Sequence, residues 1–291
     1  MPDYNVFPDY KTRKEIINEL CDRYKFIKHC FAGKSVCGRG IDVLHIGNTK
    51  NRVLYCGGFH GSEYLTILAL LKFFEECCEA MESDKTVGGC KIGNFLSIRG
   101  LTIVPCVNPD GTEIALHGSD AAFKYKPLVE KVCTDTYKWQ ANARGVDINH
   151  NFNAGWCRLK QLELKNNIKC PAPTRFGGNH PESEPETKAL TTLCRNIDFE
   201  RAIALHSQGR EIYCSFGRHT PVLSFRLASM FSQASGYNIA TGGGFKDWFI
   251  EKFRRPALTI EMGLGKNPLP LSDFEEEYKI LQNILCLGAV V

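Results

Sequence analysis

The sequence lacks the features that mark several common protein classes. No uninterrupted apolar run approaches the length of a membrane span. The N-terminal segment 1–10 has no basic start followed by an apolar core, which a secretory signal requires. The 36 lysines and arginines are dispersed among 32 aspartates and glutamates, so the net charge of +4 gives no nucleic-acid-binding signature. We therefore expect a cytoplasmic protein that binds neither membranes nor nucleic acid.

Cysteine is abundant, with 14 residues, but no Cys-x-x-Cys pair occurs. In a secreted chain this number would suggest a disulfide framework. Here most of the cysteines lie within apolar runs, as Cys56, Cys106 and Cys194 do. Free thiols that pack as small core side chains fit this pattern better than a cysteine zinc site, and they imply a reducing compartment.

The chain also lacks linkers, low-complexity runs and internal repeats. With 291 residues and 43% hydrophobic content, it can bury a substantial core. We expect one domain over residues 1–291. The richest loop signal, residues 170–181, is predicted to be a long surface connection within that domain.

Predicted helices and strands alternate along the chain. The helices are expected at 11–28, 64–81, 183–195, 221–234 and 273–287. The strands are expected at 41–46, 53–56, 101–107, 201–205 and 257–260, and Asn-Pro-Asp-Gly at 108–111 is a strong turn signal. The alternation predicts a three-layer α/β/α fold with a mixed, largely parallel central sheet. In such sheets functional groups collect beyond the carboxyl ends of strands, which is where His60, Asn108, His206 and Glu261 fall.

His60 and Glu63 follow the strand expected at 53–56 and two glycines. An imidazole nitrogen and a carboxylate oxygen at this spacing can reach one divalent cation, and the mixed donor set suits zinc. A histidine and a glutamate three residues apart also occur by chance in many proteins. The interpretation therefore depends on the rest of the chain.

Two later strand ends supply further candidates. His206 could be a third ligand that leaves the fourth zinc position open, which is typical of a hydrolytic site. The alternative is a hydrogen-bonded structural histidine. Glu261 ends an apolar run and could serve as a general base beside a metal-bound water. The alternative for Glu261 is a salt bridge at the sheet edge.

A dense polar segment spans residues 142–152. It contains one arginine, one aspartate, three asparagines and a histidine within eleven residues. Core packing gives no reason for so many hydrogen-bonding groups, so the segment favours a polar site over a solvated loop.

Together these motifs resemble the zinc carboxypeptidase family. They are, in order, His60-x-x-Glu63, Asn-Pro-Asp-Gly, Gly-Val-Asp-x-Asn-x-Asn-Phe at 145–152, His206-Ser and Thr-x-Glu261, and the resemblance covers about residues 40–265. The segments 242–248 and 263–270, with Arg255-Pro, are most similar to one bacterial branch. That branch contains the γ-D-glutamyl-L-diamino acid peptidases, which cut cell-wall peptides.

The resemblance implies one Zn²⁺ per chain, held by His60, Glu63 and His206. It also implies that Glu261 activates the zinc-bound water and then protonates the leaving amine. Asp147 would orient a ligand histidine. Arg144 would stabilise the developing oxyanion.

Substrate-binding residues are expected at Asn149, His150 and Lys246. The digestive members of the family have Asn-Arg where this chain has Asn149-His150, and histidine cannot reproduce the two-pronged grip of arginine on a terminal carboxylate. Lys246 precedes an Asp-Trp pair, at a position that helps to set side-chain preference in those enzymes. A cation there would favour a substrate with an extra carboxylate, as in meso-diaminopimelate. The alternative is a lysine that points to solvent.

The leading hypothesis is a zinc metallopeptidase that hydrolyses the γ-D-Glu–meso-diaminopimelate bond of muropeptides. A second enzyme hypothesis is a carboxypeptidase that removes acidic residues from protein tails. A third is an amide hydrolase that acts on small N-acyl amino acids. A different class of protein, a non-catalytic peptide-binding relative, would have little reason to keep His60, Glu63, His206 and Glu261.

Overall fold

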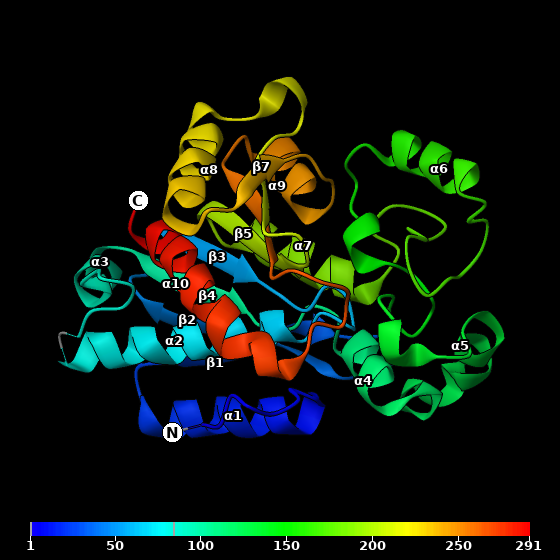
Figure 1. Cartoon of the computed structure of the whole chain (residues 1–291), viewed down its shortest axis with the longest axis horizontal. Helices are drawn as coiled ribbons and strands as arrows, with labels where there is room; N and C mark the ends of the chain where they lie inside the picture. Colours follow the sequence, from blue (N-terminus) through cyan, green and yellow to red (C-terminus); the bar gives the residue numbers. More distant parts are fainter. Residues whose placement is uncertain (1, 84) are drawn as a thin grey trace.

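A mixed sheet runs through the computed structural model, which describes residues 2–83 and 85–291 (Figure 1). Within these residues the sheet has eight strands in the order β1-β2-β4-β3-β5-β8-β6-β7. The β4, β3, β5 and β8 strands run parallel to one another, whereas β1, β2 and β6 pair antiparallel with neighbours. The strands are β1 Lys28–Lys34, β2 Gly40–Gly47, β3 Arg52–Cys56, β4 Gly100–Val104, β5 Phe199–Ser207, β6 Glu211–Tyr213, β7 Asn238–Ala240 and β8 Ala257–Met262.

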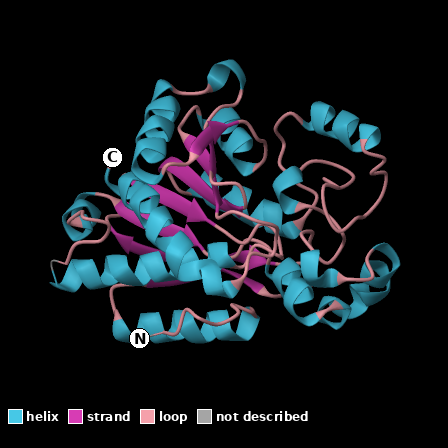
Figure 2. Cartoon of the chain, viewed as in Figure 1, coloured by secondary structure: helices cyan, strands magenta, loops and turns pink. Residues whose placement is uncertain are grey.

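Helices cover both faces of this sheet (Figure 2). Alternate side chains of a strand point to opposite faces, and β3 shows this clearly. Val53 and Tyr55 pack in the larger core cluster, and Leu54 and Cys56 pack in the second. The larger cluster joins the sheet to α1 Tyr10–Arg23, α2 Leu65–Ser83, α3 Ile92–Ile98, α8 Val222–Ser235 and α10 Phe274–Val290. The second joins it to α7 Pro185–Asn196 and α9 Phe245–Phe253. The layers confirm the predicted α/β/α fold class.

A smaller apolar cluster forms around Trp139 and Ile114. It joins α4 Pro109–His117 and α5 Lys126–Val132 to the loop that carries the polar segment 142–152. Another helix of this region, α6 Trp156–Lys165, lies with them at the right of Figure 1. These elements surround the polar segment.

Some predicted elements differ from the structure. The helix expected at 11–28 ends at Arg23, and β1 begins at Lys28 as a mostly exposed edge strand whose sequence carries little apolar pattern. The turn expected at 108–111 is the start of α4. There the Asn108 side chain accepts a hydrogen bond from the Gly111 amide, and Pro109 occupies the first helical position, which favours helix initiation.

All fourteen cysteines are free. Seven of them are buried, as expected for thiols that pack in a core, whereas Cys30, Cys157 and Cys170 are exposed. Among the helices of the described residues, none combines the length and the apolar character needed to cross a bilayer.

Candidate active site

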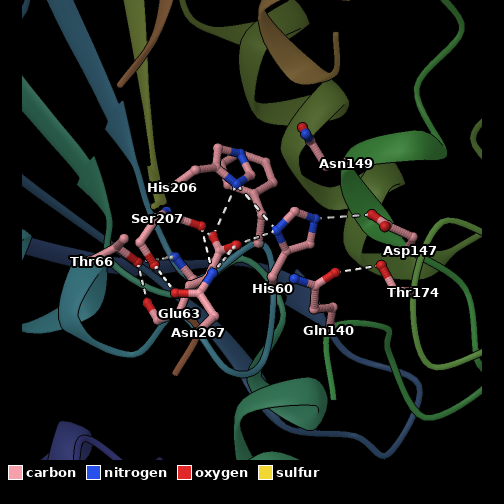
Figure 3. Close-up of polar contacts among 12 residues, drawn as sticks. His60, Glu63, Thr66, Gln140, Asp147, Asn149, Thr174, His206, Ser207 and Asn267 are labelled. Carbon is pink, nitrogen blue, oxygen red and sulfur yellow. Dashed lines mark hydrogen bonds and ion pairs between the residues drawn. The ribbon is translucent and has the colours of Figure 1, made fainter. Parts of the chain in front are cut away.

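Three predicted ligands meet beyond the carboxyl ends of β3 and β5 (Figure 3). The Nδ1 atom of His60 lies 2.8 Å from Oε1 of Glu63, and Nδ1 of His206 lies 3.1 Å from Oε2 of the same carboxylate. The two Nδ1 atoms are 3.3 Å apart. Residues separated by 146 positions in the chain are thus brought into contact because β3 and β5 are neighbours in the sheet.

These distances fit a tetrahedral metal ion. Zinc bonds to imidazole nitrogen are about 2.0–2.1 Å long, so two nitrogen ligands of one tetrahedral zinc lie about 3.3 Å apart. The His60 and His206 nitrogens have this separation. Burial raises the pKa of the Glu63 carboxyl, but His60 and His206 more than offset this effect and hold it below its usual range. A carboxylate and two imidazole lone pairs directed at one point form a cation-binding donor set.

Asp147 fixes the orientation of the His60 ring. Its Oδ1 atom lies 3.1 Å from His60 Nε2, an arrangement in which Nε2 donates to Asp147 while Nδ1 faces Glu63 and His206. Burial raises the pKa of the Asp147 carboxyl, but His150 and His60 lower it far below its usual range, which keeps it ionised. The predicted partnership of Asp147 with a ligand histidine is therefore seen in the geometry.

His206 is held mainly by stacking. Its ring is 1% exposed and stacks on Phe59, with ring centroids 4.9 Å apart. Its Nε2 atom is buried and has no hydrogen-bond partner in the part of the chain that the structure describes. Stacking on Phe59 and the Glu63 contact at Nδ1 orient this second histidine, and no carboxylate holds its Nε2 atom in the described residues.

Asn267 supports Glu63, and the sequence analysis did not identify it. Its amide nitrogen donates to Glu63 Oε1 at 3.3 Å and to the Ser207 carbonyl at 2.6 Å, while the Ser207 hydroxyl donates to Asn267 Oδ1 at 2.8 Å. The Ser207 backbone N–H donates to Glu63 Oε2 at 3.3 Å. The only sequence signal was the position of Asn267 within the segment 263–270, which served there as a family marker.

Glu261 stands beside the ligand set. It is the register partner of His206 between the parallel strands β5 and β8. Burial and then the negative charge of Glu63 raise the pKa of its carboxyl well above the usual range. Within residues 2–83 and 85–291, the Glu261 carboxylate forms no hydrogen bond and no ion pair. The salt bridge that was the alternative role for Glu261 is therefore not present in these residues. An unpaired acid with a raised pKa suits proton transfer.

Arg144 lies apart from this group. Its side chain is 44% exposed and its Nη1 atom lies 3.5 Å from Glu184, with the guanidinium over the Tyr125 ring. Gln140 lies closer to the ligands. Its backbone carbonyl accepts from the Gly61 N–H at 3.2 Å, and its side-chain oxygen accepts from the Thr174 hydroxyl (Figure 3).

The Thr174 contact uses the Gln140 oxygen and leaves the amide N–H groups available to the site. Gln140 was not predicted from the sequence, because it lies two positions before the polar segment 142–152.

A cavity of about 520 Å³ contains two of the predicted substrate-binding residues, Asn149 and His150, in its lining. The three predicted ligands and Glu261 are not lining residues, but Phe152 of the lining packs on Phe59, which stacks on His206. The Asn149 side chain accepts from the Phe245 N–H at 3.0 Å, which ties the polar segment to α9. Lys246 is not among the lining residues. Its side chain is fully buried, and the ammonium donates to the Ser215 carbonyl at 2.9 Å and pairs with Asp247.

Lys246 therefore does not point to solvent, which was the alternative considered. Its ammonium lies behind the cavity wall, since both of its partners line the cavity. A direct contact between Lys246 and substrate stays a prediction, and its observed contacts hold the wall in place.

Known proteins match both the sequence and the fold. The family described as zinc carboxypeptidase matches residues 14–238. Gamma-D-glutamyl-L-diamino acid endopeptidase 1 of Lysinibacillus sphaericus is 34% identical over 287 residues, which is 96% of this chain and 72% of that protein. The uncharacterized protein YqgT of Bacillus subtilis strain 168 is 32% identical, over 96% of this chain and 76% of its own length. Bovine thrombin-activatable fibrinolysis inhibitor superposes with a TM-score of 0.76 at 21% identity, over 98% of this chain and 97% of that chain.

Proposed function

Since this chain belongs to the zinc carboxypeptidase family and is a metallopeptidase, we propose that it hydrolyses the γ-D-Glu–meso-diaminopimelate bond of cell-wall muropeptides. The observation that carries the chemistry is the convergence of His60, Glu63 and His206 beside the unpaired carboxyl of Glu261. The substrate class is supported by the 34% identity with the gamma-D-glutamyl-L-diamino acid endopeptidase 1 of Lysinibacillus sphaericus.

We propose that His60, Glu63 and His206 hold one Zn²⁺. When bound, zinc acts as a Lewis acid that polarises the scissile carbonyl and makes water more acidic. Asp147 keeps the His60 ring in the metal-binding tautomer, and Asn267 keeps the Glu63 carboxylate turned toward the histidines.

Glu261 would move the proton. Its carboxylate accepts a proton from the attacking water as the carbon–oxygen bond forms, and it returns that proton to the amide nitrogen as the carbon–nitrogen bond breaks. The raised pKa of this carboxyl, caused by burial and by Glu63, brings its proton affinity closer to that needed for both steps.

The oxyanion would be stabilised by Gln140 rather than by the Arg144 of the sequence prediction. The Gln140 amide is already oriented by Thr174 and can donate N–H groups. The Arg144 guanidinium is directed to Glu184 and Tyr125 instead. Asn149 and His150, which line the cavity, would contact the leaving amino acid.

A cytoplasmic role in processing imported wall fragments fits the free thiols, which persist in a reducing compartment. The alternative function, removal of acidic residues from protein tails, uses the same catalytic groups. The two differ in the bond attacked and in the amino acid released.

Hydrolysis of two matched substrates tests the proposal. The zinc-loaded protein is incubated with L-Ala-γ-D-Glu-meso-diaminopimelate and with an N-blocked peptide that ends in L-glutamate. We expect release of diaminopimelate from the first and no release of glutamate from the second. Release of glutamate without release of diaminopimelate would establish the acidic carboxypeptidase instead.

A further inference from the structure

The cavity beside the ligand set carries an excess of positive charge. Two acids, Glu163 and Asp247, line it together with His150, Arg158 and Arg175. Each acid is already neutralised by a lysine. Glu163 pairs with Lys160 and also accepts from the Gly177 N–H at 2.8 Å.

Asp247 pairs with the buried Lys246 and accepts from the Gly244 N–H at 3.3 Å. Neither acid is therefore free to balance the two arginines. No ion pair or hydrogen bond joins the guanidinium of Arg158 or Arg175 to another group in residues 2–83 and 85–291. Two exposed arginines without an ion-pair partner thus line a cavity whose two acids are each paired with a lysine.

The backbone at Arg175 has an unusual conformation, which sets the direction in which its side chain leaves the chain. Its φ of +66° lies in the left-handed region, which is uncommon for a residue other than glycine. Two contacts impose this conformation. The Arg175 N–H donates to Asp147 Oδ2 at 2.9 Å, and the Arg175 carbonyl accepts from His150 Nδ1 at 3.1 Å. Strained backbone is often retained where it aims a functional side chain.

The same contacts connect the cavity to the ligand set. Asp147 binds the Arg175 backbone through one oxygen and the His60 ring through the other. On the opposite side, Phe152 lines the cavity and packs on Phe59, which stacks on His206. A molecule in the cavity therefore lies against the walls that position both zinc-binding histidines.

Part of the remaining cavity wall is apolar, and Asn149, Asn166, Ser215 and Thr241 also line it. Leu159, Leu162, Ile168 and Phe216 supply the apolar part, alongside the cationic groups. An aliphatic chain that ends in a carboxylate matches this combination, since the methylenes meet the apolar wall and the carboxylate meets a guanidinium. Lysine, which has the same chain length but ends in an ammonium alone, would place its charge against the arginines.

We infer that Arg158 and Arg175 form a subsite for the far carboxylate of the leaving diamino acid. This inference rests on the proposed function, in which the residue released by hydrolysis occupies this cavity. In this inference, Arg158 and Arg175 determine which diamino acid the protein prefers in its substrate. No sequence motif indicated either residue. His150, which also lines the cavity, does not have to bind that carboxylate.

Two peptides that differ in one carboxylate test the subsite. L-Ala-γ-D-Glu-meso-diaminopimelate and L-Ala-γ-D-Glu-L-Lys share the scissile bond, and the lysine peptide lacks only the far carboxylate. We expect kcat/KM to favour the diaminopimelate peptide roughly tenfold, because the lysine peptide lacks the carboxylate that would accept charge-assisted hydrogen bonds from the guanidinium groups. In the Arg158→Ala/Arg175→Ala variant the ratio should fall toward one, while Arg226→Ala, on the exposed side of α8, should retain the wild-type ratio.

The outcomes separate this inference from the proposed function. Cleavage of both peptides with equal kcat/KM by the unaltered protein, or an unchanged ratio in the double variant, overturns the subsite and leaves the proposed function standing. Failure to cleave either peptide overturns the proposed function itself.

Calorimetric binding of free meso-diaminopimelate then tests the cavity without turnover. We expect at least about tenfold weaker binding to the double variant than to the Arg226→Ala protein. Equal affinities would contradict the subsite.

Discussion

His206 and Glu261 occupy paired positions on adjacent parallel strands, so a proposed zinc ligand and the proposed base project side by side from the same edge of the sheet. Neither residue needs a flexible loop to reach the other. Both backbones are held in the sheet, so Glu261 lies beside the predicted ligands before substrate binds. Catalysis requires this kind of preorganisation.

Replacing Glu261 with glutamine should abolish proton transfer and leave the metal bound. The amide keeps the shape of the carboxyl but cannot accept and return a proton, so kcat should fall by about 10³-fold. Zinc content, measured by elemental analysis after gel filtration, should stay at one per chain, since Glu261 is outside the ligand set. Turnover within a few-fold of the unaltered protein would remove Glu261 from the mechanism.

Asn267→Ala should weaken zinc binding without touching a ligand. The substitution removes the hydrogen bonds that hold the Glu63 carboxylate and the Ser207 backbone, and loss of such supporting groups commonly costs about 10- to 100-fold in metal affinity. Competition with a chromogenic chelator measures the change. Asn94→Ala on the exposed side of α3 is the matched control and should bind zinc as the unaltered protein does. Equal affinities of the two variants would show that Asn267 is not needed to orient Glu63.

Much of the fold and of the ligand set follows from local pattern. Short apolar segments alternate with amphipathic ones, which predicts parallel strands, and parallel strands bring their carboxyl ends to one edge. His60, His206 and Glu261 could be placed together on this basis, because His206 and Glu261 lie at the carboxyl ends of such strands and His60 follows the end of another by four residues.

The supporting residues could not be found in this way. Asn267 reaches Glu63 across 204 positions through a loop, and a loop carries no periodic signal of where it will fold. Lys246 precedes an aspartate in the sequence, and only the packing of α9 shows that its ammonium is buried against Asp247 and Ser215. The role of Arg144 was predicted from the family resemblance, whereas the nearby Glu184 determines where its guanidinium is directed.

Gln140 and Arg144 can be separated by mutation. Gln140→Ala should lower kcat by about 10²-fold with a smaller effect on KM, because the lost N–H donor would act chiefly in the transition state. Arg144→Ala should change kcat less than about threefold, since its guanidinium contacts Glu184 and Tyr125. Steady-state kinetics on the diaminopimelate peptide measures both. A large fall in kcat for Arg144→Ala with none for Gln140→Ala would restore the sequence prediction and remove the role proposed for Gln140.

His45 should make the protein less stable in mild acid. This β2 residue is 7% exposed, its Nδ1 atom lies 2.9 Å from the Thr102 hydroxyl, and burial, followed by the charges of Arg52 and Lys28, lowers its pKa to about 4. In the unfolded chain the pKa is about 6.5. Between these values the unfolded chain binds a proton that the folded chain does not, so stability is fully present above about pH 6.5 and is lost as the pH falls toward 4.

The expected loss in the free energy of unfolding is on the order of 2 kcal/mol. Urea unfolding of the metal-free protein between pH 4.5 and 7.5 measures it without interference from zinc release. His45→Gln can still hydrogen-bond Thr102 but cannot titrate, so its unfolding free energy should fall less steeply with acid. Exposed His180→Gln is the control and should keep the steep dependence. Parallel curves for His45→Gln and the unaltered protein would show that protonation of this buried histidine does not limit stability in acid.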